Sequence, residues 1–129
     1  MNSRDKEWLH AIVANIEKLE SKISRHHITQ EKFLADDLYK DSVAMLVFNI
    51  TEYVNKLSAD IKQTYGEIPW QMIVGMRNKF AHGYDGMIED FIWDVAVEHL
   101  PDLKIYCRKI LSSLSSGSST TGIPTPPTR

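Results

Sequence analysis

The chain has little of several features that define common classes of protein. It has one cysteine, so it forms no internal disulfide and no CxxC metal knuckle, a usage that fits a reducing cytoplasm. Its 129 residues contain no apolar run of membrane-spanning length, and the first ten, MNSRDKEWLH, lack the apolar region of a signal peptide. The net charge of −2 disfavours a polycation that coats nucleic acid. We therefore expect a cytoplasmic protein without disulfides.

Proline and glycine are scarce before residue 115. Residues 1–114 hold only Pro69, Pro101 and four glycines, which disfavours a turn-rich sandwich or barrel and favours long helices. From residue 115 to 129, thirteen of the fifteen residues are Ser, Thr, Gly or Pro. Such a segment has too little apolar surface to offset the entropy of ordering it. The sequence therefore predicts one folded domain over residues 1–114 and a disordered Ser/Thr/Pro-rich tail over 115–129.

Apolar residues recur at three- and four-residue steps in five segments, and no alternating strand pattern is present. The expected helices cover residues 9 to about 24, 36 to about 63, 70–82, 88–99 and 103–114. The second is apolar on most sides and should be the central helix, preceded by an N-cap at Thr29. Gly66, Gly83 and the Leu100-Pro101-Asp102 segment should end helices. The pattern predicts an all-α, antiparallel bundle of four to five helices.

The segment MRNKFAHGYDGM, residues 76–87, contains the best candidates for chemistry. Arg77 and His82 are five positions apart, about 140° of rotation and roughly 7.5 Å of rise on a helix, so they share no face of a straight helix. Because Gly83 should end that helix, His82 can turn away from it. Asn78 shares the face of His82 and could orient its ring or contact a substrate. Arginine grips phosphate and histidine exchanges protons near neutral pH, which suffices to cleave RNA without a metal.

A plain structural role is the alternative for the same residues. Arginine and histidine near a helix C-terminus complement its dipole, and spacing alone favours this interpretation over catalysis. The five histidines show no metal-binding spacing, and the chain has no phosphate-binding glycine loop and no nucleophile elbow. We therefore expect no metal site and no cofactor.

A family resemblance changes this balance. Residues 77–84, RNKFAHGY, match the signature of HepT-like proteins: Arg, four residues, His, one residue, Tyr. These proteins are a branch of the HEPN superfamily of small all-α ribonuclease toxins. The similarity extends over GEIPWQMIVGMRNKFAHGY, FIWDVAVEHLPDLKIY and FNITEYVNKLS, and so over residues 41 to about 111. One departure is Ile50-Thr51-Glu52, where the branch commonly has Ile-Gly-Glu; the threonine should alter how closely two helices approach, while Glu52 is retained.

The resemblance implies a function and its partners. It implies a metal-independent endoribonuclease toxin of a toxin–antitoxin system, with Arg77 and His82 catalytic at the cleft of a symmetric homodimer. The implied antitoxin is an MNT-type nucleotidyltransferase that transfers AMP to the motif tyrosine, here Tyr84, and so switches RNA cleavage off. Tyr84 could instead be a dimer-interface aromatic. The alternative function is a catalytically silent helical adaptor that binds a nucleotidyltransferase partner.

Other residues support the site or the core. Glu52 could hydrogen-bond Arg77 and orient it, or it could be solvated. Gly75 inside a helix suggests a close approach of another helix. Trp70 and Trp93 should be packing anchors, and Cys107 should be an inert core thiol.

Overall fold

The computed structural model describes residues 3–81 and 89–119, and every secondary-structure element within them is helical. The elements are α1 (Ser3–Arg25), α2 (Gln30–Ala35), α3 (Asp37–Lys56), α4 (Ala59–Thr64), α5 (Trp70–Ala81), α6 (Glu89–Asp94), the π-helical segment η2 (Val95–His99) and α7 (Leu100–Ser119). None of the described helices combines the length and the apolar character needed to cross a membrane. The predicted all-α class is confirmed.

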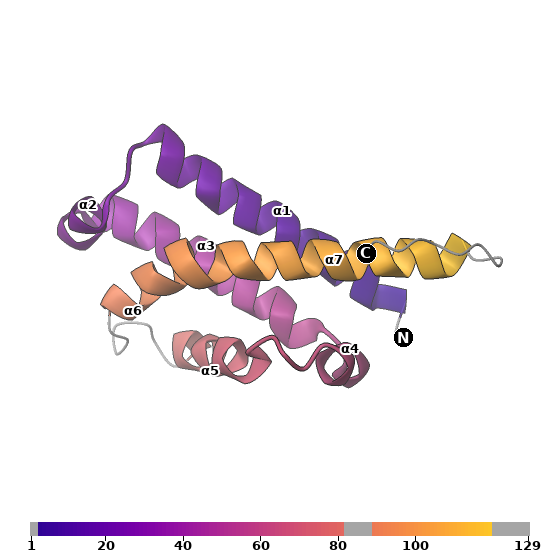
Figure 1. Cartoon of the computed structure of the whole chain (residues 1–129). Coiled ribbons are helices and arrows are strands. Elements are labelled where there is room, and N and C mark those ends of the chain that lie inside the picture. The colour runs from indigo at the N-terminus through magenta and orange to yellow at the C-terminus, as the bar shows by residue number, and fades with distance from the viewer. Residues whose placement is uncertain (1–2, 82–88, 120–129) are drawn as a thin grey trace.

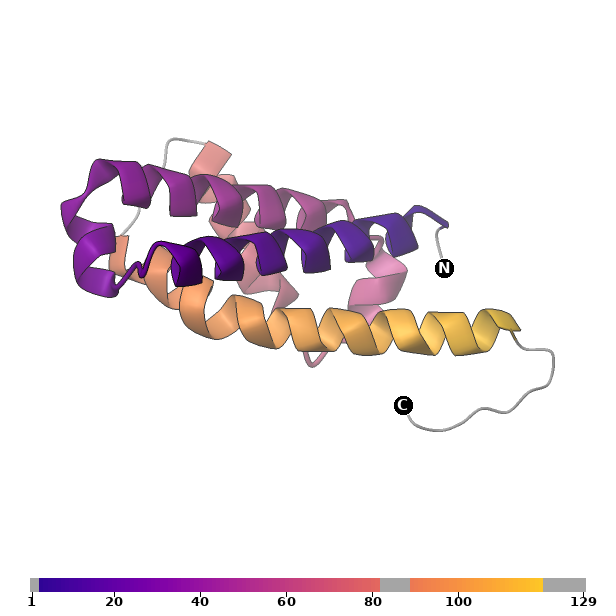
Figure 2. The same cartoon turned by 90° about the horizontal axis from the view of Figure 1, so that it is seen from above.

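Three long helices form the body of the bundle. Helix α1 packs against both α3 and α7 and runs antiparallel to them (Figures 1 and 2). Helix α5 packs against α3, while α2 and α6 contact one another at the far end of the bundle and α4 lies at the end where α1 begins (Figure 1). Helix α3 contacts α1, α2, α5 and η2, which confirms it as the central helix.

The core follows the apolar spacing of the sequence. The fully buried stripes are Leu9, Ile12, Ile16 and Leu19 of α1, Val43, Val47, Ile50 and Val54 of α3, and Leu100, Leu103, Cys107 and Ile110 of α7. Steps of three and four residues place each set on one face of its helix, and burial of these faces is the main favourable contribution to folding. Cys107 is fully buried, and this burial raises the pKa of its thiol to about 12. The core role expected for Cys107 is confirmed.

The single helix expected over residues 36 to about 63 is wrong. Helix α3 ends at Lys56, and α4 begins at Ala59 with Ser58 as its N-cap. Asp5 of α1, which is 1% exposed, accepts hydrogen bonds from the Ser58 amide at 2.9 Å and from the Ser58 hydroxyl at 2.6 Å. A buried carboxylate 53 residues away therefore holds the break between the two helices. The Thr29 cap is confirmed, because its hydroxyl accepts from the Lys32 amide that opens α2.

The helix break expected at Leu100-Pro101-Asp102 is also wrong, because α6, η2 and α7 follow one another without a gap. A proline lacks the amide N–H, and its ring clashes with the carbonyl four residues earlier in a regular helix. Here the wider π turn precedes it, and the Leu100 amide donates to the carbonyl of Val95, five residues back. Pro101 thereby falls in the first turn of α7, where a missing N–H is tolerated.

The C-terminal boundary lies near the end of α7. This helix is described to Ser119, five residues past the boundary expected at residue 114. Residues 120–129 lie outside the described part of the chain. The division into a domain over 1–114 and a tail over 115–129 stays a prediction.

Candidate active site around Arg77

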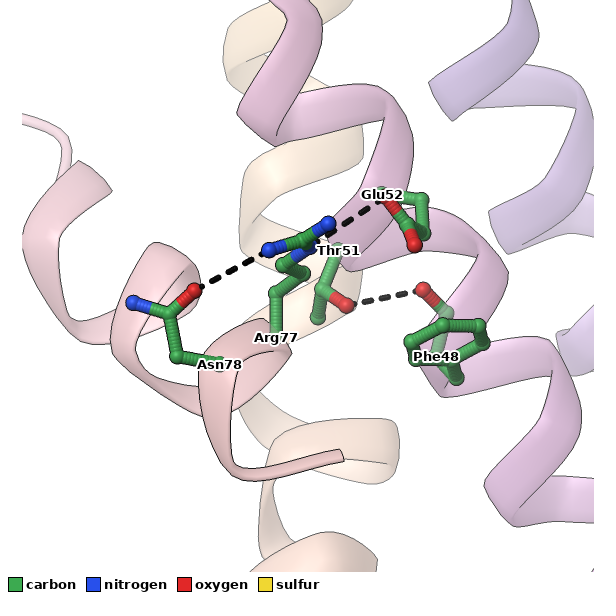
Figure 3. A network of polar contacts seen from close by, with 5 residues as sticks. All are labelled: Phe48, Thr51, Glu52, Arg77 and Asn78. Atoms are coloured by element: carbon green, nitrogen blue, oxygen red, sulfur yellow. Dashed lines mark hydrogen bonds and ion pairs between the residues drawn. The ribbon is translucent and has the colours of Figure 1, made fainter. Parts of the chain in front are cut away.

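Arg77 lies near the end of α5 and reaches across to α3. Its Nε donates to Oε1 of Glu52 at 3.3 Å, and each of the two side chains is 31% exposed (Figure 3). Of the two alternatives for Glu52, the structure shows the one in which it bonds Arg77. An ionised acceptor makes this a charge-assisted hydrogen bond, which fixes the plane of the guanidinium better than a neutral one does.

Asn78 holds the same guanidinium from the other side. Its Oδ1 accepts a hydrogen bond from the terminal nitrogen Nη1 of Arg77 at 3.2 Å (Figure 3). Within the described residues, the bonds to Glu52 and Asn78 use two of the five guanidinium N–H groups, and the other three suffice for a bidentate contact with a phosphate. Arg77 is therefore oriented and still able to bind an anion.

The other two motif residues cannot be placed against Arg77. His82 and Tyr84 lie outside the described residues, and α5 as described ends at Ala81, directly before His82. The catalytic role of His82, the modification of Tyr84 and the face shared by Asn78 and His82 stay predictions.

An aromatic contact fixes the end of α5, and the sequence reasoning did not single it out. The rings of Phe48 on α3 and Phe80 on α5 meet edge to face with centroids 5.3 Å apart. Phe48 precedes Glu52 by one helical turn, and Phe80 follows Arg77 by nearly one turn, so the aromatic pair and the ion pair lie one after the other along the same helix contact. This matched spacing is the signal that could have revealed the pair.

Thr51 occupies the position where the branch commonly has glycine. Its side chain is fully buried, and its hydroxyl donates to the carbonyl of Phe48 at 2.7 Å (Figure 3). A buried hydroxyl without a partner would be costly, and this bond within α3 removes that cost. The threonine is thus accommodated beside Arg77 with its hydroxyl bonded within α3.

The expectation for Gly75 is wrong. A Cβ added there would meet no atom of residues 3–81 and 89–119 within 4 Å, so no helix of this part of the chain approaches it closely. Gly75 instead lines an open groove of about 820 Å³ beside α5. The tryptophan predictions are confirmed: Trp70 is 5% exposed and its indole N–H donates to the Tyr65 carbonyl at 3.0 Å, and the ring of Trp93 packs on Phe33 at 5.2 Å between centroids.

Acidic residues elsewhere have structural partners. Glu89 forms an ion pair with Lys40 at 3.0 Å, and its hydrogen bond raises the pKa of Lys40. Asp90 accepts from Gln30 at 3.1 Å, so both acids tie α6 to the preceding helices. Among residues 3–81 and 89–119, no three His, Cys, Asp or Glu side chains are grouped so that they could hold a metal ion.

Comparisons with known proteins bear on this geometry. A family model described as "Ribonuclease HepT-like" matches residues 12–110, which include Glu52 and Arg77. "Probable ribonuclease HepT" from Thermococcus cleftensis is 31% identical over 104 residues, which are 81% of this chain and 93% of that protein. "Putative RNase MJ0125" from Methanocaldococcus jannaschii is 32% identical over 84 residues, which are 65% of this chain and 72% of that protein. No solved structure matches the chain significantly.

Proposed function

This chain belongs to the HepT-like ribonuclease family, and we propose that it is an endoribonuclease whose active site forms at the end of α5. The observation that carries the proposal is the orientation of Arg77 by Glu52 and Asn78, which leaves guanidinium N–H groups for a phosphate. The ribonuclease names of its relatives support the same class of reaction.

The proposed reaction needs only this chain's own residues and RNA. Arg77 binds the scissile phosphate and stabilises the charge that develops on it. The 2′-hydroxyl oxygen attacks phosphorus, the bond from phosphorus to the 5′ oxygen breaks, and the products carry a 2′,3′-cyclic phosphate and a 5′-hydroxyl. His82 takes the proton from the 2′-hydroxyl or gives one to the leaving oxygen. Since each chain has one motif histidine, a dimer can supply both the base and the acid.

Substitution of the motif residues tests this reaction. We expect His82→Ala and Arg77→Ala to abolish cleavage of an RNA oligonucleotide in EDTA, while His99→Ala, a histidine of η2, cleaves normally. Circular dichroism should show the same helical fold in all three variants. Cleavage that disappears with EDTA, or that survives in His82→Ala, would contradict the mechanism. A pure, folded wild-type protein that binds a nucleotidyltransferase but cuts no RNA would instead support the silent adaptor.

We further propose a two-fold homodimer. Leu38 is 74% exposed and Met45 58% exposed, although both lie on the central helix α3. Steps of seven residues from Leu38 to Met45 and on to Glu52 place the three on nearly one line. This stripe carries two exposed apolar side chains, with Asp41 and Ser42 between them, and it leads to the Arg77 site. A second copy packed along this stripe would cover the exposed leucine and methionine and bring the two Arg77 sites together.

The stripe can be tested without touching the site. Met45→Lys should convert a dimer to a monomer in light scattering at micromolar concentration and reduce RNA cleavage. Ile105→Lys on α7, a side chain that is 50% exposed, is the matched control and should stay dimeric. Dimer loss only in the Ile105 variant would place the interface on α7 and contradict the proposal.

The regulatory part of the proposal concerns Tyr84. We propose that an MNT-type nucleotidyltransferase antitoxin transfers AMP to its hydroxyl in a toxin–antitoxin system. Each added AMP would bring negative charge and bulk two residues from His82, where both oppose RNA binding. After incubation with that partner, ATP and magnesium, mass spectrometry should find AMP on the peptide that contains Tyr84. The control variant Tyr106→Phe should be modified in the same way, and Tyr84→Phe should not be modified. Neutralisation of toxic Tyr84→Phe by the partner would show that binding alone is the switch.

A further inference from the structure

The groove beside α5 is continuous with the Arg77 site. Its wall on α5 includes Gln71, Val74, Gly75 and Asn78, which recur at three- and four-residue steps and so form one face about 10 Å long. Asn78 belongs to both places: it lines the groove, and its Oδ1 accepts the hydrogen bond from Arg77. A molecule bound in the groove therefore lies next to whatever Arg77 binds.

The chemistry of the groove suits a planar heterocycle. Trp70 and Met72 line it with apolar surface, and the Trp70 indole N–H is already bonded to the Tyr65 carbonyl. The side-chain amides of Gln63, Gln71 and Asn78 border this surface. An amide presents a donor and an acceptor together, as the edge of a nucleobase does.

Orientation and charge point to the same ligand. Because the Asn78 oxygen faces Arg77, its amide nitrogen points away from the guanidinium (Figure 3). Among the described residues that line the groove, Lys62 alone carries a formal charge, and no carboxylate is present to repel a phosphate. Burial lowers the pKa of this lysine, while Asp5 acts in the opposite direction.

We propose that this groove is a base-binding subsite, which holds a nucleobase of single-stranded RNA adjacent to the phosphate that Arg77 binds. The inference rests on the proposed endoribonuclease function and adds to it a source of sequence preference. The groove volume of about 820 Å³ is in the range of small-molecule sites and exceeds what one base needs. Proteins read single-stranded RNA by contacts to the faces of its bases and by hydrogen bonds to their edges. The groove offers the apolar side chain of Met72 for a base face and three side-chain amides for its edge.

Gly75 permits a direct test. A Cβ at this position meets no atom of the described residues within 4 Å, so the side chain of Gly75→Leu starts into open space. The substitution also removes a glycine from a helix interior, so the fold should persist. Ala14→Leu, at an exposed position of α1, is the matched control. Binding is measured by fluorescence anisotropy with a fully 2′-O-methylated RNA oligonucleotide, which cannot be cleaved.

We expect Gly75→Leu to raise the Kd for this RNA at least tenfold, and Ala14→Leu to change it less than twofold. We also expect Gln71→Ala to redistribute the cut sites on an unmodified RNA of mixed sequence. Unchanged affinity and cut sites in both groove variants, beside an active wild type, would overturn the subsite and leave the endoribonuclease intact. A Gly75→Leu protein that becomes monomeric in light scattering would overturn it too, because a second copy would then cover the groove. Wild type and Ala14→Leu that both fail to cut RNA would overturn the endoribonuclease itself.

Discussion

Neutralising Glu52 separates a positioning role from a purely structural one. The pair with Arg77 has an N–O distance of 3.3 Å, and both side chains are 31% exposed, so solvent screens the interaction. Exposed pairs contribute up to about 1 kcal/mol. Glu52→Gln keeps an oxygen acceptor and should lower the free energy of unfolding by less than about 1 kcal/mol, a fall in Tm of at most roughly 6 °C.

The effects on catalysis should be larger and should be confined to kcat, with no rise in KM. Loss of the charged acceptor frees the guanidinium, and misplacement of a catalytic group by about 1 Å can cost on the order of 10²-fold in rate. The same change removes a negative charge near the RNA phosphate. At a separation of about 6 Å in water this repulsion is roughly 0.7 kcal/mol, or about threefold in affinity. We expect kcat to fall 10- to 100-fold in Glu52→Gln and further in Glu52→Ala, while KM falls or stays unchanged.

The assay combines steady-state cleavage of a fluorescent RNA with urea unfolding of the same preparations. Glu17→Gln is the control, because Glu17 on α1 forms an ion pair with Arg108 on α7, away from the site, and this pair is also partly exposed. Glu17→Gln should lower the free energy of unfolding by no more than Glu52→Gln does, and it should keep the kcat and KM of the wild type. The reasoning is refuted if kcat in Glu52→Gln equals that of wild type, or falls only in proportion to the folded fraction.

Further predictions concern three buried residues, Asp5, Cys107 and Thr51. Asp5→Ala leaves the Ser58 amide and hydroxyl without their buried acceptor and should lower the free energy of unfolding by about 2–3 kcal/mol in urea titrations; a loss below about 0.5 kcal/mol would contradict this. Burial raises the pKa of Cys107 from 9.0 to about 12, so its thiol should resist alkylation at pH 8 until urea unfolds the protein. As pH rises from 9 to about 12 only the unfolded thiol ionises, so stability should fall over this window, and less steeply in Cys107→Ala. Thr51→Gly removes a fully buried side chain from a helix interior and should cost about 1–3 kcal/mol in thermal unfolding.

The helices could be predicted wherever their stability depends on their own apolar spacing. The buried stripes of α1, α3 and α7 are visible in the sequence because steps of three and four residues must share a face. The break at Ser58 could not be predicted, because the apolar spacing continues through it. Its cause is the hydrogen bonding to Asp5, which lies 53 residues earlier in the sequence. The continuous helix through Pro101 could not be predicted either. The π turn before the proline is what lets the helix continue, and the spacing of apolar residues does not indicate such a turn.

The site shows the same division between local and long-range information. The motif identified Arg77, but only the fold shows that Glu52 bonds it and that Phe48 and Phe80 lie beside this contact. For Gly75 the usual inference from sequence failed. A glycine inside a helix permits a close neighbour but does not require one, and whether another helix or open space faces it depends on how α5 lies on α3.

Two faces of α5 explain how one short helix can organise both proposed sites. Trp70, Ile73, Met76 and Phe80 recur at three- and four-residue steps, and this stripe is turned toward the interior. Arg77 directly follows Met76, so its side chain reaches α3 and Glu52, whereas Asn78 is rotated by a further 100° or so toward the groove. The contact between α5 and α3 therefore sets the position of the phosphate-binding group, and the α5 wall of the groove is fixed relative to that group. Residues that strengthen this contact without touching RNA should affect the rate and the base preference together.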